Sequence, residues 1–224
     1  MSQTKHQGVE PSKASHVAFF MFVLPAMSIG LAWLLSTAVS AIFGAERAFL
    51  IDSVGAIGAW GFLYTAFDRV LWKLSLFRWV GVVDVPVLGG RWTGTIRSSF
   101  DGGTEISAAL EIAQTFSHIR ACLYSPQSQS ASIVAGFVRG ADHQLELHYE
   151  YRNEPAIQAA ETMHSHPGTV VLRHVLHTNR LDGHYYNRGR DHRGHTGTMS
   201  FGFEGKNLLG AHSVSVPEAH TPTA

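Results

Sequence analysis

The sequence predicts a two-part protein: an N-terminal two-helix transmembrane hairpin, followed by an all-β domain in which eight antiparallel strands form a meander closed as a small β-barrel. Three observations predict this fold class. Two long apolar segments lie near the N-terminus, and a short segment rich in Gly and Pro follows them. From there on, the hydrophobic pattern changes from helical spacing to two-residue alternation.

Residues 17–43 form the first apolar segment and carry no charged side chain. A helix of this length spans about 40 Å at about 1.5 Å per residue, which exceeds the roughly 30 Å hydrocarbon core of a bilayer. A cleaved signal peptide has a much shorter apolar region, so this helix is expected to remain in the protein. Residues 1–16, which precede it, are polar and are predicted to form a disordered cytosolic N-terminus.

Residues 48–67 form the second apolar segment, in which Asp52 is the only charged residue. Tryptophans and basic residues follow it, as is typical of helix ends at a membrane surface. Small residues four apart, such as Ala26 and Gly30, are expected to let the two helix backbones approach. The predicted hairpin therefore covers residues 17–80.

Basic residues flank this hairpin unevenly. Its two outer flanks hold five, and the connection between the helices holds one, Arg47. Because basic flanks stay in the cytoplasm, both termini and the β domain are predicted to be cytosolic, and the protein is predicted to cross the membrane twice. The five outer residues are Lys5, Lys13, Arg69, Lys73 and Arg78.

The C-terminal part is predicted to be a linker at 81–89, a barrel at 90–205 and a disordered tail at 206–224. Closure of a meander into a barrel removes exposed sheet edges, and eight strands leave an interior filled by side chains or by one small ligand. The eight strands are expected at residues 90–99, 104–116, 118–125, 130–139, 144–152, 168–178, 180–187 and 195–205.

Motifs for catalysis and metal binding are sparse. The sequence has no nucleophile elbow, P-loop or zinc-protease motif, so neither an enzymatic activity nor a cofactor is predicted. Among 14 histidines, His164 and His166 are spaced to share a strand face. A structural zinc site needs four converging ligands, usually with cysteines, and Cys122 is the single cysteine. No metal site is predicted.

The segment GHYYNRGRDHRGHTGTMSFGF, residues 183–203, gathers three arginines and three histidines at one predicted turn. Guanidinium groups bind phosphate, and tyrosine rings stack on nucleobases. From residue 86 onward, 11 Lys and Arg stand against 12 Asp and Glu, so a long nucleic acid is not a predicted partner. A small phosphorylated ligand needs only a few arginines. A solvated hairpin is the alternative interpretation of this turn.

Three motifs follow the apolar segments in a characteristic order. They are LGGRWTG at 88–94, LELHYEYRNEP at 145–155 and RLDGHYYNRGRDHRGHTGTMSF at 180–201. Together they resemble the SMODS-associated effectors of CBASS anti-phage systems, which have two transmembrane helices and a β-strand-rich domain. The resemblance covers about residues 17–205.

This resemblance implies a β-barrel that binds a cyclic di- or oligonucleotide made by a partner nucleotidyltransferase. It further implies homo-oligomers that disrupt the lipids of the bacterial inner membrane and cause abortive infection. The motif positions expected to bind the ligand are Trp92, Tyr149, Tyr151, Arg152, Tyr185, Asn187, Arg188 and Arg190.

Two other functions remain open from the residues alone. The spacing Gly90-x-Trp92 at the first strand is also used by lipocalin-like barrels, which would make the protein a membrane-anchored barrel for a lipid or small metabolite. A fully packed barrel would instead make it a protein-binding scaffold.

Overall fold

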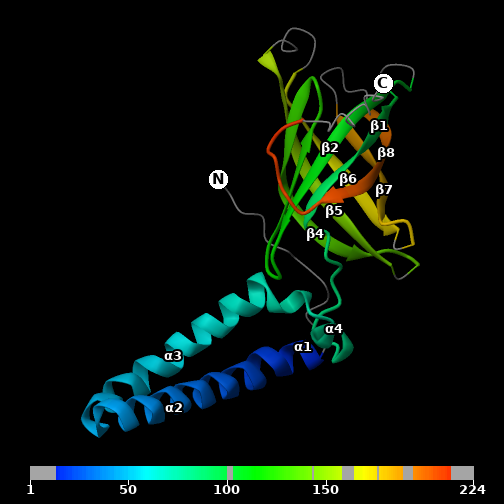
Figure 1. The fold of residues 1–224 in the computed structure, drawn as a ribbon. Helices are drawn as coiled ribbons and strands as arrows, with labels where there is room; N and C mark the ends of the chain where they lie inside the picture. Colours follow the sequence, from blue (N-terminus) through cyan, green and yellow to red (C-terminus); the bar gives the residue numbers. More distant parts are fainter. Residues whose placement is uncertain are drawn as a thin grey trace, which may run out of the picture. The chain divides into compact units, whose positions relative to one another are not determined.

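The computed structural model describes residues 14–99, 103–142, 144–157, 164–175, 177–188 and 194–212. The chain divides into two compact units (Figure 1). Among the described residues, the helical unit holds 14–87 together with Thr115–Ser117, and the barrel unit holds Leu88–Gln114 and the chain from His118 onward.

The helical unit begins with one continuous helical stretch that contains a widened turn. Pro25 follows this π-helical turn, and because proline has no N–H and its ring crowds the preceding turn, a local widening is the expected adjustment. The helical elements are α1 (Ala14–Ala18), η1 (Phe19–Val23), α2 (Leu24–Phe43), α3 (Ala45–Arg69), η2 (Leu71–Lys73) and α4 (Ser75–Trp79).

Helices α2 and α3 are joined at Gly44, whose φ of 92° favours glycine, and they lie side by side (Figure 1). The buried positions of α2 recur every four residues and form a stripe of mostly small side chains that faces α3. Ala26 and Gly30, predicted at this contact, are exposed instead, because the stripe is offset from them by two residues. The stripe consists of Leu24, Ser28, Ala32 and Ser36.

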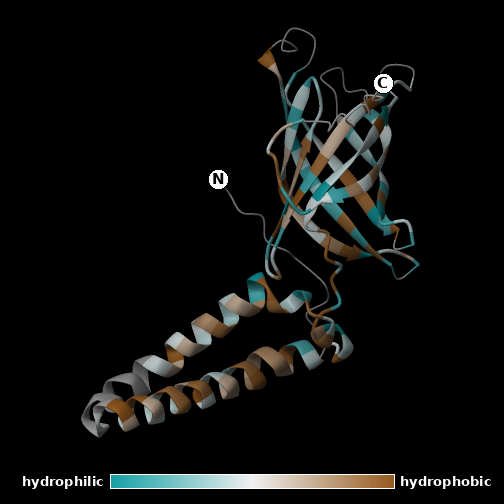
Figure 2. Cartoon of the chain, in the orientation of Figure 1, coloured by the Kyte–Doolittle hydropathy of each residue, from teal (hydrophilic) through white to brown (hydrophobic). Residues whose placement is uncertain are grey.

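One helical stretch among the described residues, Ser15–Ile42, is long and apolar enough to cross a membrane. Apolar residues run along α2 in Figure 2, and the side chains of Met21, Phe22 and Trp33 are 68%, 70% and 65% exposed. The first of the two predicted spans is therefore present as a candidate. The second apolar segment forms α3, and the side chain of Asp52 lies outside the described residues.

The predicted eight-stranded antiparallel barrel is confirmed. Each strand pairs with its neighbours in sequence, and β8 pairs with β1 to close the barrel (Figure 1). The strands are β1 (Gly90–Ser98), β2 (Glu105–Gln114), β3 (Ile119–Tyr124), β4 (Ser128–Arg139), β5 (Leu145–Pro155), β6 (His166–Val175), β7 (Arg180–Arg188) and β8 (Gly194–Gly205).

Two inward-facing glycines let neighbouring strands of the barrel approach closely. A Cβ on Gly94 would lie 1.9 Å from the carbonyl oxygen of Ser200, and one on Gly183 would lie 1.9 Å from that of Val171. No side chain fits at these distances, so glycine is required at both positions. Large apolar side chains such as Leu110 are buried in the interior as well.

Residues 206–212 lie along the outer face of the barrel, although the sequence predicts them as part of a disordered tail. Backbone groups of Leu209, Gly210 and Ala211 bind side chains of β1 and β2. Such partners come from strands about a hundred residues away, so no local pattern reveals them. Residues 213–224, like residues 1–13, are outside the described residues.

Candidate ligand site in the barrel

Five inward-facing polar residues meet at the end of the barrel where β5 leads into β6 and β7 leads into β8. We call them the tyrosine cluster: Tyr149, Tyr151, His166, Tyr185 and Asn187. The strand register brings them together, because Tyr151 lies opposite Gly168, which in turn lies opposite Asn187 on the next strand. The three tyrosines are buried, with exposed fractions of 3%, 7% and 8% in chain order.

Contacts within the tyrosine cluster fix its side chains. The ring centroids of Tyr149 and Tyr151 are 6.4 Å apart, and those of Tyr151 and His166 are also 6.4 Å apart. The Asn187 side chain donates through Nδ2 to Nε2 of His166 at 3.0 Å. Nδ1 of His166 then carries the proton and donates to the carbonyl oxygen of His164 at 2.9 Å. These bonds define one orientation of the Asn187 amide.

Glycines opposite two of the tyrosines leave room for their rings. A Cβ on Gly168 would lie 2.4 Å from the phenol end of Tyr151, and a Cβ on Gly197 would lie 2.2 Å from the ring of Tyr185. Any larger residue at either position would displace the ring from the barrel interior. Glycine at positions 168 and 197 therefore leaves room for two tyrosine rings at this end of the barrel.

Two buried polar atoms of the tyrosine cluster have no hydrogen-bond partner within the part of the chain that the structure describes. They are Oη of Tyr149 and Oδ1 of Asn187. A buried polar atom left unpaired costs about 1–3 kcal/mol, so such atoms usually have a water or a ligand as partner. The interior end of the barrel thus offers hydrogen-bonding atoms to a bound molecule.

Burial raises the pKa of both inner phenols. For Tyr149, loss of solvation is the largest cause of the upward shift. For Tyr151, loss of solvation and the neighbouring Tyr185 raise the pKa, while the Asn187 side chain acts in the opposite direction. Both phenols therefore stay protonated at neutral pH and keep a hydroxyl that can donate or accept.

The tyrosine cluster suits the bases and sugars of a nucleotide better than its phosphates. Aromatic faces stack on nucleobases, and neutral hydroxyl and amide groups bind base edges and ribose. None of its five residues is an Arg or Lys. The sequence places an arginine-rich turn in the connection after β7, which follows Asn187 of the cluster.

The structure separates Trp92 from the other predicted ligand-binding residues. Trp92 pairs with Phe203 and Tyr185 pairs with Gly197, six residues away along β8, or about 20 Å at roughly 3.3 Å per residue. Its indole Nε1 donates to the carbonyl oxygen of Leu88 at 2.9 Å, and its ring packs against Phe203. Trp92 therefore closes the opposite end of the barrel.

Of the three predicted arginines, the structure describes the side chain of Arg152 alone, and it does not join the tyrosine cluster. Arg152 is exposed on the outer face of β5, because its neighbours Tyr151 and Asn153 face inward. Arg188 ends β7, but its side chain lies outside the described residues, and so does all of Arg190. Four of the eight predicted positions come together, namely Tyr149, Tyr151, Tyr185 and Asn187.

Sequence reasoning missed His166 and the two glycines that accommodate the rings. The sequence marks His166 only as half of an H-x-H metal pattern, whereas in the structure its ring accepts a hydrogen bond from the Asn187 side chain. Its signal was available in the two-residue alternation of β6, which places it on the same face as Gly168. Among the described residues, no group of three or more His, Cys, Asp or Glu side chains is arranged to hold a metal ion.

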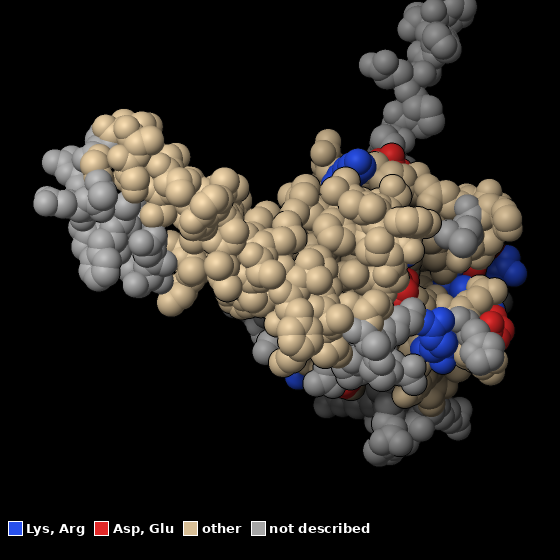
Figure 3. Space-filling view, turned by 90° about the horizontal axis from the view of Figure 1, so that it is seen from below, with Lys and Arg blue, Asp and Glu red and all other residues tan. Residues whose placement is uncertain are grey.

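Charged side chains are scattered over the face of the molecule seen in Figure 3. Duplex-binding proteins present a continuous basic patch or stripe, and the visible face carries none among its described residues.

Comparison with known proteins identifies the family of the barrel domain. The family of the Cap15 cyclic dinucleotide receptor domain matches residues 83–202, more than half of the chain. The chain belongs to the Cap15 receptor-domain family. CD-NTase-associated protein 15 of Yersinia aleksiciae is 32% identical over 135 residues, which cover 60% of this chain and 63% of that protein. The protein of the same name from Escherichia albertii is 30% identical over 86 residues, covering 38% and 44%.

The Cap15 match places the expected CBASS-type receptor domain on the barrel and includes every residue of the tyrosine cluster. Both alignments cover less than two thirds of the relatives' lengths. The match ends at Gly202, so Lys206–His212 lie beyond the matched residues.

Proposed function

We propose that this Cap15-family chain is an anti-phage defence effector whose cytosolic barrel binds a cyclic dinucleotide or oligonucleotide through the tyrosine cluster. The proposal rests on two buried atoms, Tyr149 Oη and Asn187 Oδ1, that have no hydrogen-bond partner among the described residues. Both lie inside a barrel of the cyclic dinucleotide receptor family. A nucleobase stacked on Tyr151 or Tyr185 would supply partners for both atoms. Arg188 and Arg190 are proposed to meet the phosphates.

The helical unit is proposed to act on the membrane. Both α2 and α3 would insert into the bacterial inner membrane as a hairpin, with the barrel and both termini in the cytosol. The candidate span Ser15–Ile42 and the basic outer flanks support this topology. Two helices enclose no pore, so membrane disruption and abortive infection would require a homo-oligomer, formed when the messenger from a partner nucleotidyltransferase is bound. The proposal includes no catalysis, cofactor or metal.

Co-expression in a bacterial host tests the proposal. The full chain, produced with an active cyclic-dinucleotide synthase, is expected to depolarise the inner membrane and stop growth, and a catalytically dead synthase is expected to leave both unchanged. A chain that lacks residues 17–67 is expected to bind the nucleotide without depolarising cells, because it has lost the membrane helices.

Voltage-sensitive dye fluorescence measures the depolarisation, and titration of the purified chains measures nucleotide binding. Depolarisation that persists without residues 17–67, or without synthase activity, would contradict the proposal.

A further inference from the structure

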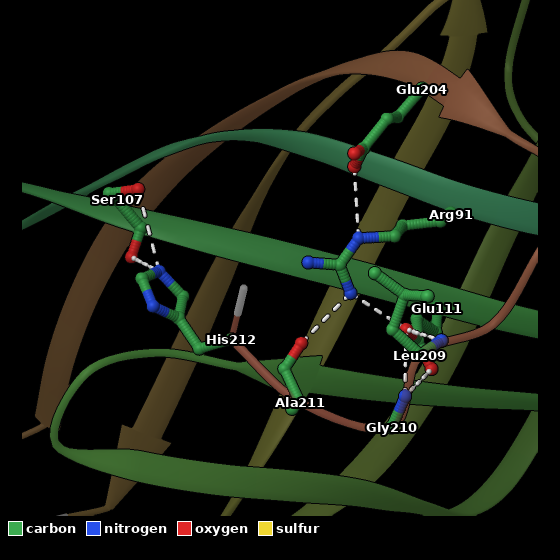
Figure 4. A network of polar contacts seen from close by, with 8 residues as sticks. All are labelled: Arg91, Ser107, Glu111, Glu204, Leu209, Gly210, Ala211 and His212. Atoms are coloured by element: carbon green, nitrogen blue, oxygen red, sulfur yellow. Dashed lines mark hydrogen bonds and ion pairs between the residues drawn. The ribbon is translucent and has the colours of Figure 1, made fainter. Parts of the chain in front are cut away.

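The segment Lys206–His212 crosses the outer face of β1 and β2 and is held there by side chains that point away from the barrel interior. Figure 4 shows this network. Arg91 of β1 and Glu111 of β2 face outward, yet their side chains are only 2% and 5% exposed. Charged groups on the outside of a barrel are normally solvated, so the burial of this pair is unusual, and the backbone of the segment contacts both side chains.

The carboxylate of Glu111 receives consecutive backbone N–H groups of the segment. The amide of Leu209 donates to Oε1 at 2.7 Å, and the amide of Gly210 donates to both oxygens at 3.2 Å. Gly210 has a φ of 70°, a left-handed conformation that turns successive amides toward one point. Backbone amides arranged in this way form an anion-binding nest.

Arg91 connects three parts of the barrel unit. Its Nε donates to Oε2 of Glu204 on β8 at 2.9 Å. Its Nη1 donates to Oε1 of Glu111 on β2 at 2.7 Å and to the carbonyl oxygen of Ala211 in the segment at 2.9 Å. A single buried guanidinium thus joins the first, second and last strands to the chain that follows them.

This connection lies where the ladder between β1 and β8 is irregular. The register shifts between Arg91 and Trp92, which leaves Glu204 as an additional residue of β8 at a β-bulge. The same ladder closes the barrel and joins residues 113 apart in sequence, so its formation carries a large loop-closure cost. We call this pairing of β1 with β8 the closing seam of the barrel. Side-chain bonds hold the closing seam at the point where its backbone pairing is interrupted.

We propose that Lys206–His212 is a releasable strap that locks the closing seam of the barrel through Arg91 and Glu111. The strap is held mainly by polar contacts, and its own Leu208 and Leu209 are 46% and 55% exposed. It can therefore leave the surface without uncovering the apolar core, which is the behaviour of a locally unfolding element. Its departure removes partners from the buried charge pair and loosens the start of β1.

The start of β1 is the point where loosening should be detected. The amides of Leu88 and Gly89 donate to Oε1 of Gln114 at 2.7 and 3.0 Å, which ties this segment to β2. Attachment to β8 depends on the Arg91 region. The strap thus controls how firmly the strand that follows the linker is held in the barrel.

Two truncated chains test the proposal by hydrogen–deuterium exchange and thermal melting. A chain that ends at Gly205 lacks the strap, and a control chain that ends at His212 keeps it. The first is expected to exchange at least about tenfold faster than the control at residues 88–92 and to melt at a lower temperature, with β5 and β6 equally protected in both. Equal exchange and equal melting would overturn the proposal.

A substitution in the full chain keeps the proposal testable if the shorter truncation does not fold. Glu111→Gln removes the buried charge. Glu105→Gln, on the same strand, removes a carboxylate that forms a solvent-exposed ion pair with Arg97; the side chain of Glu105 is 53% exposed and that of Arg97 is 62% exposed. Only Glu111→Gln is expected to accelerate exchange at residues 88–92, because exposed pairs contribute little. The same exchange rates in both variants would refute the lock.

Discussion

Replacement of Tyr151 by Ala is expected to weaken cyclic dinucleotide binding about 5- to 150-fold, which corresponds to the roughly 1–3 kcal/mol that one aromatic ring contributes to base stacking. The ring is 7% exposed, contacts His166 and faces Gly168, so its removal eliminates one of the aromatic faces of the tyrosine cluster. Tyr151→Phe retains the face and is expected to keep most of the affinity.

Tyr186→Ala is the matched control, because Tyr186 neighbours Tyr185 on the same strand but is 57% exposed on the outside of the barrel. Isothermal titration of folded protein compares the three variants with the parent chain, and melting curves confirm that each is folded. If Tyr151→Ala binds as tightly as Tyr186→Ala, the tyrosine cluster is not the ligand site.

Replacement of Gly183 by Ala is expected to destabilise the barrel by about 2–3 kcal/mol, a cost at the upper end of the usual range for overpacking. The added Cβ would lie 1.9 Å from the carbonyl oxygen of Val171 and 2.9 Å from Cα of Leu172. Both are backbone atoms, so β6 itself must move away from β7. The expected fall in melting temperature is about 10 °C.

Gly202→Ala is the control for this prediction. A Cβ on Gly202 would find Thr93 O at 4.0 Å as its nearest neighbour, which is ordinary contact. Thermal unfolding followed by circular dichroism measures both variants. Similar melting temperatures for the two would mean that the close approach of β6 and β7 is not needed for closure.

The strands could be predicted from sequence because alternation is a local signal. Each strand pairs with its neighbours in the chain, so the order in the barrel follows from a simple meander. The tyrosines on β5 and β7 could likewise be recognised as sharing a face. The same alternation places Arg152 on the opposite face from Tyr151, and only the motif resemblance grouped it with the ligand-binding residues. The position of Trp92 could not be inferred as easily, because motif resemblance indicates which residues are characteristic and not which end of the barrel they occupy.

The contacts of the helices and of the strap depend on partners that sequence spacing does not identify. Ala26 and Gly30 have the same spacing as Ser28 and Ala32, and only the packing of α3 selects the second pair. The sequence predicts Lys206–His212 as part of a disordered tail. Its ordered path depends on a nest of backbone amides around Glu111. Amino-acid composition does not indicate such backbone geometry, apart from one glycine, Gly210.

Titration of the purified full-length chain in lipid nanodiscs with individual cyclic di- and oligonucleotides tests the receptor function most directly. We expect saturable binding of at least one of them, with about 2.7 kcal/mol of added stability when the nucleotide is present at about 100 times its dissociation constant. We also expect that Tyr151→Ala loses this stabilisation. A folded chain that binds none of the cyclic di- or oligonucleotides would contradict the receptor function.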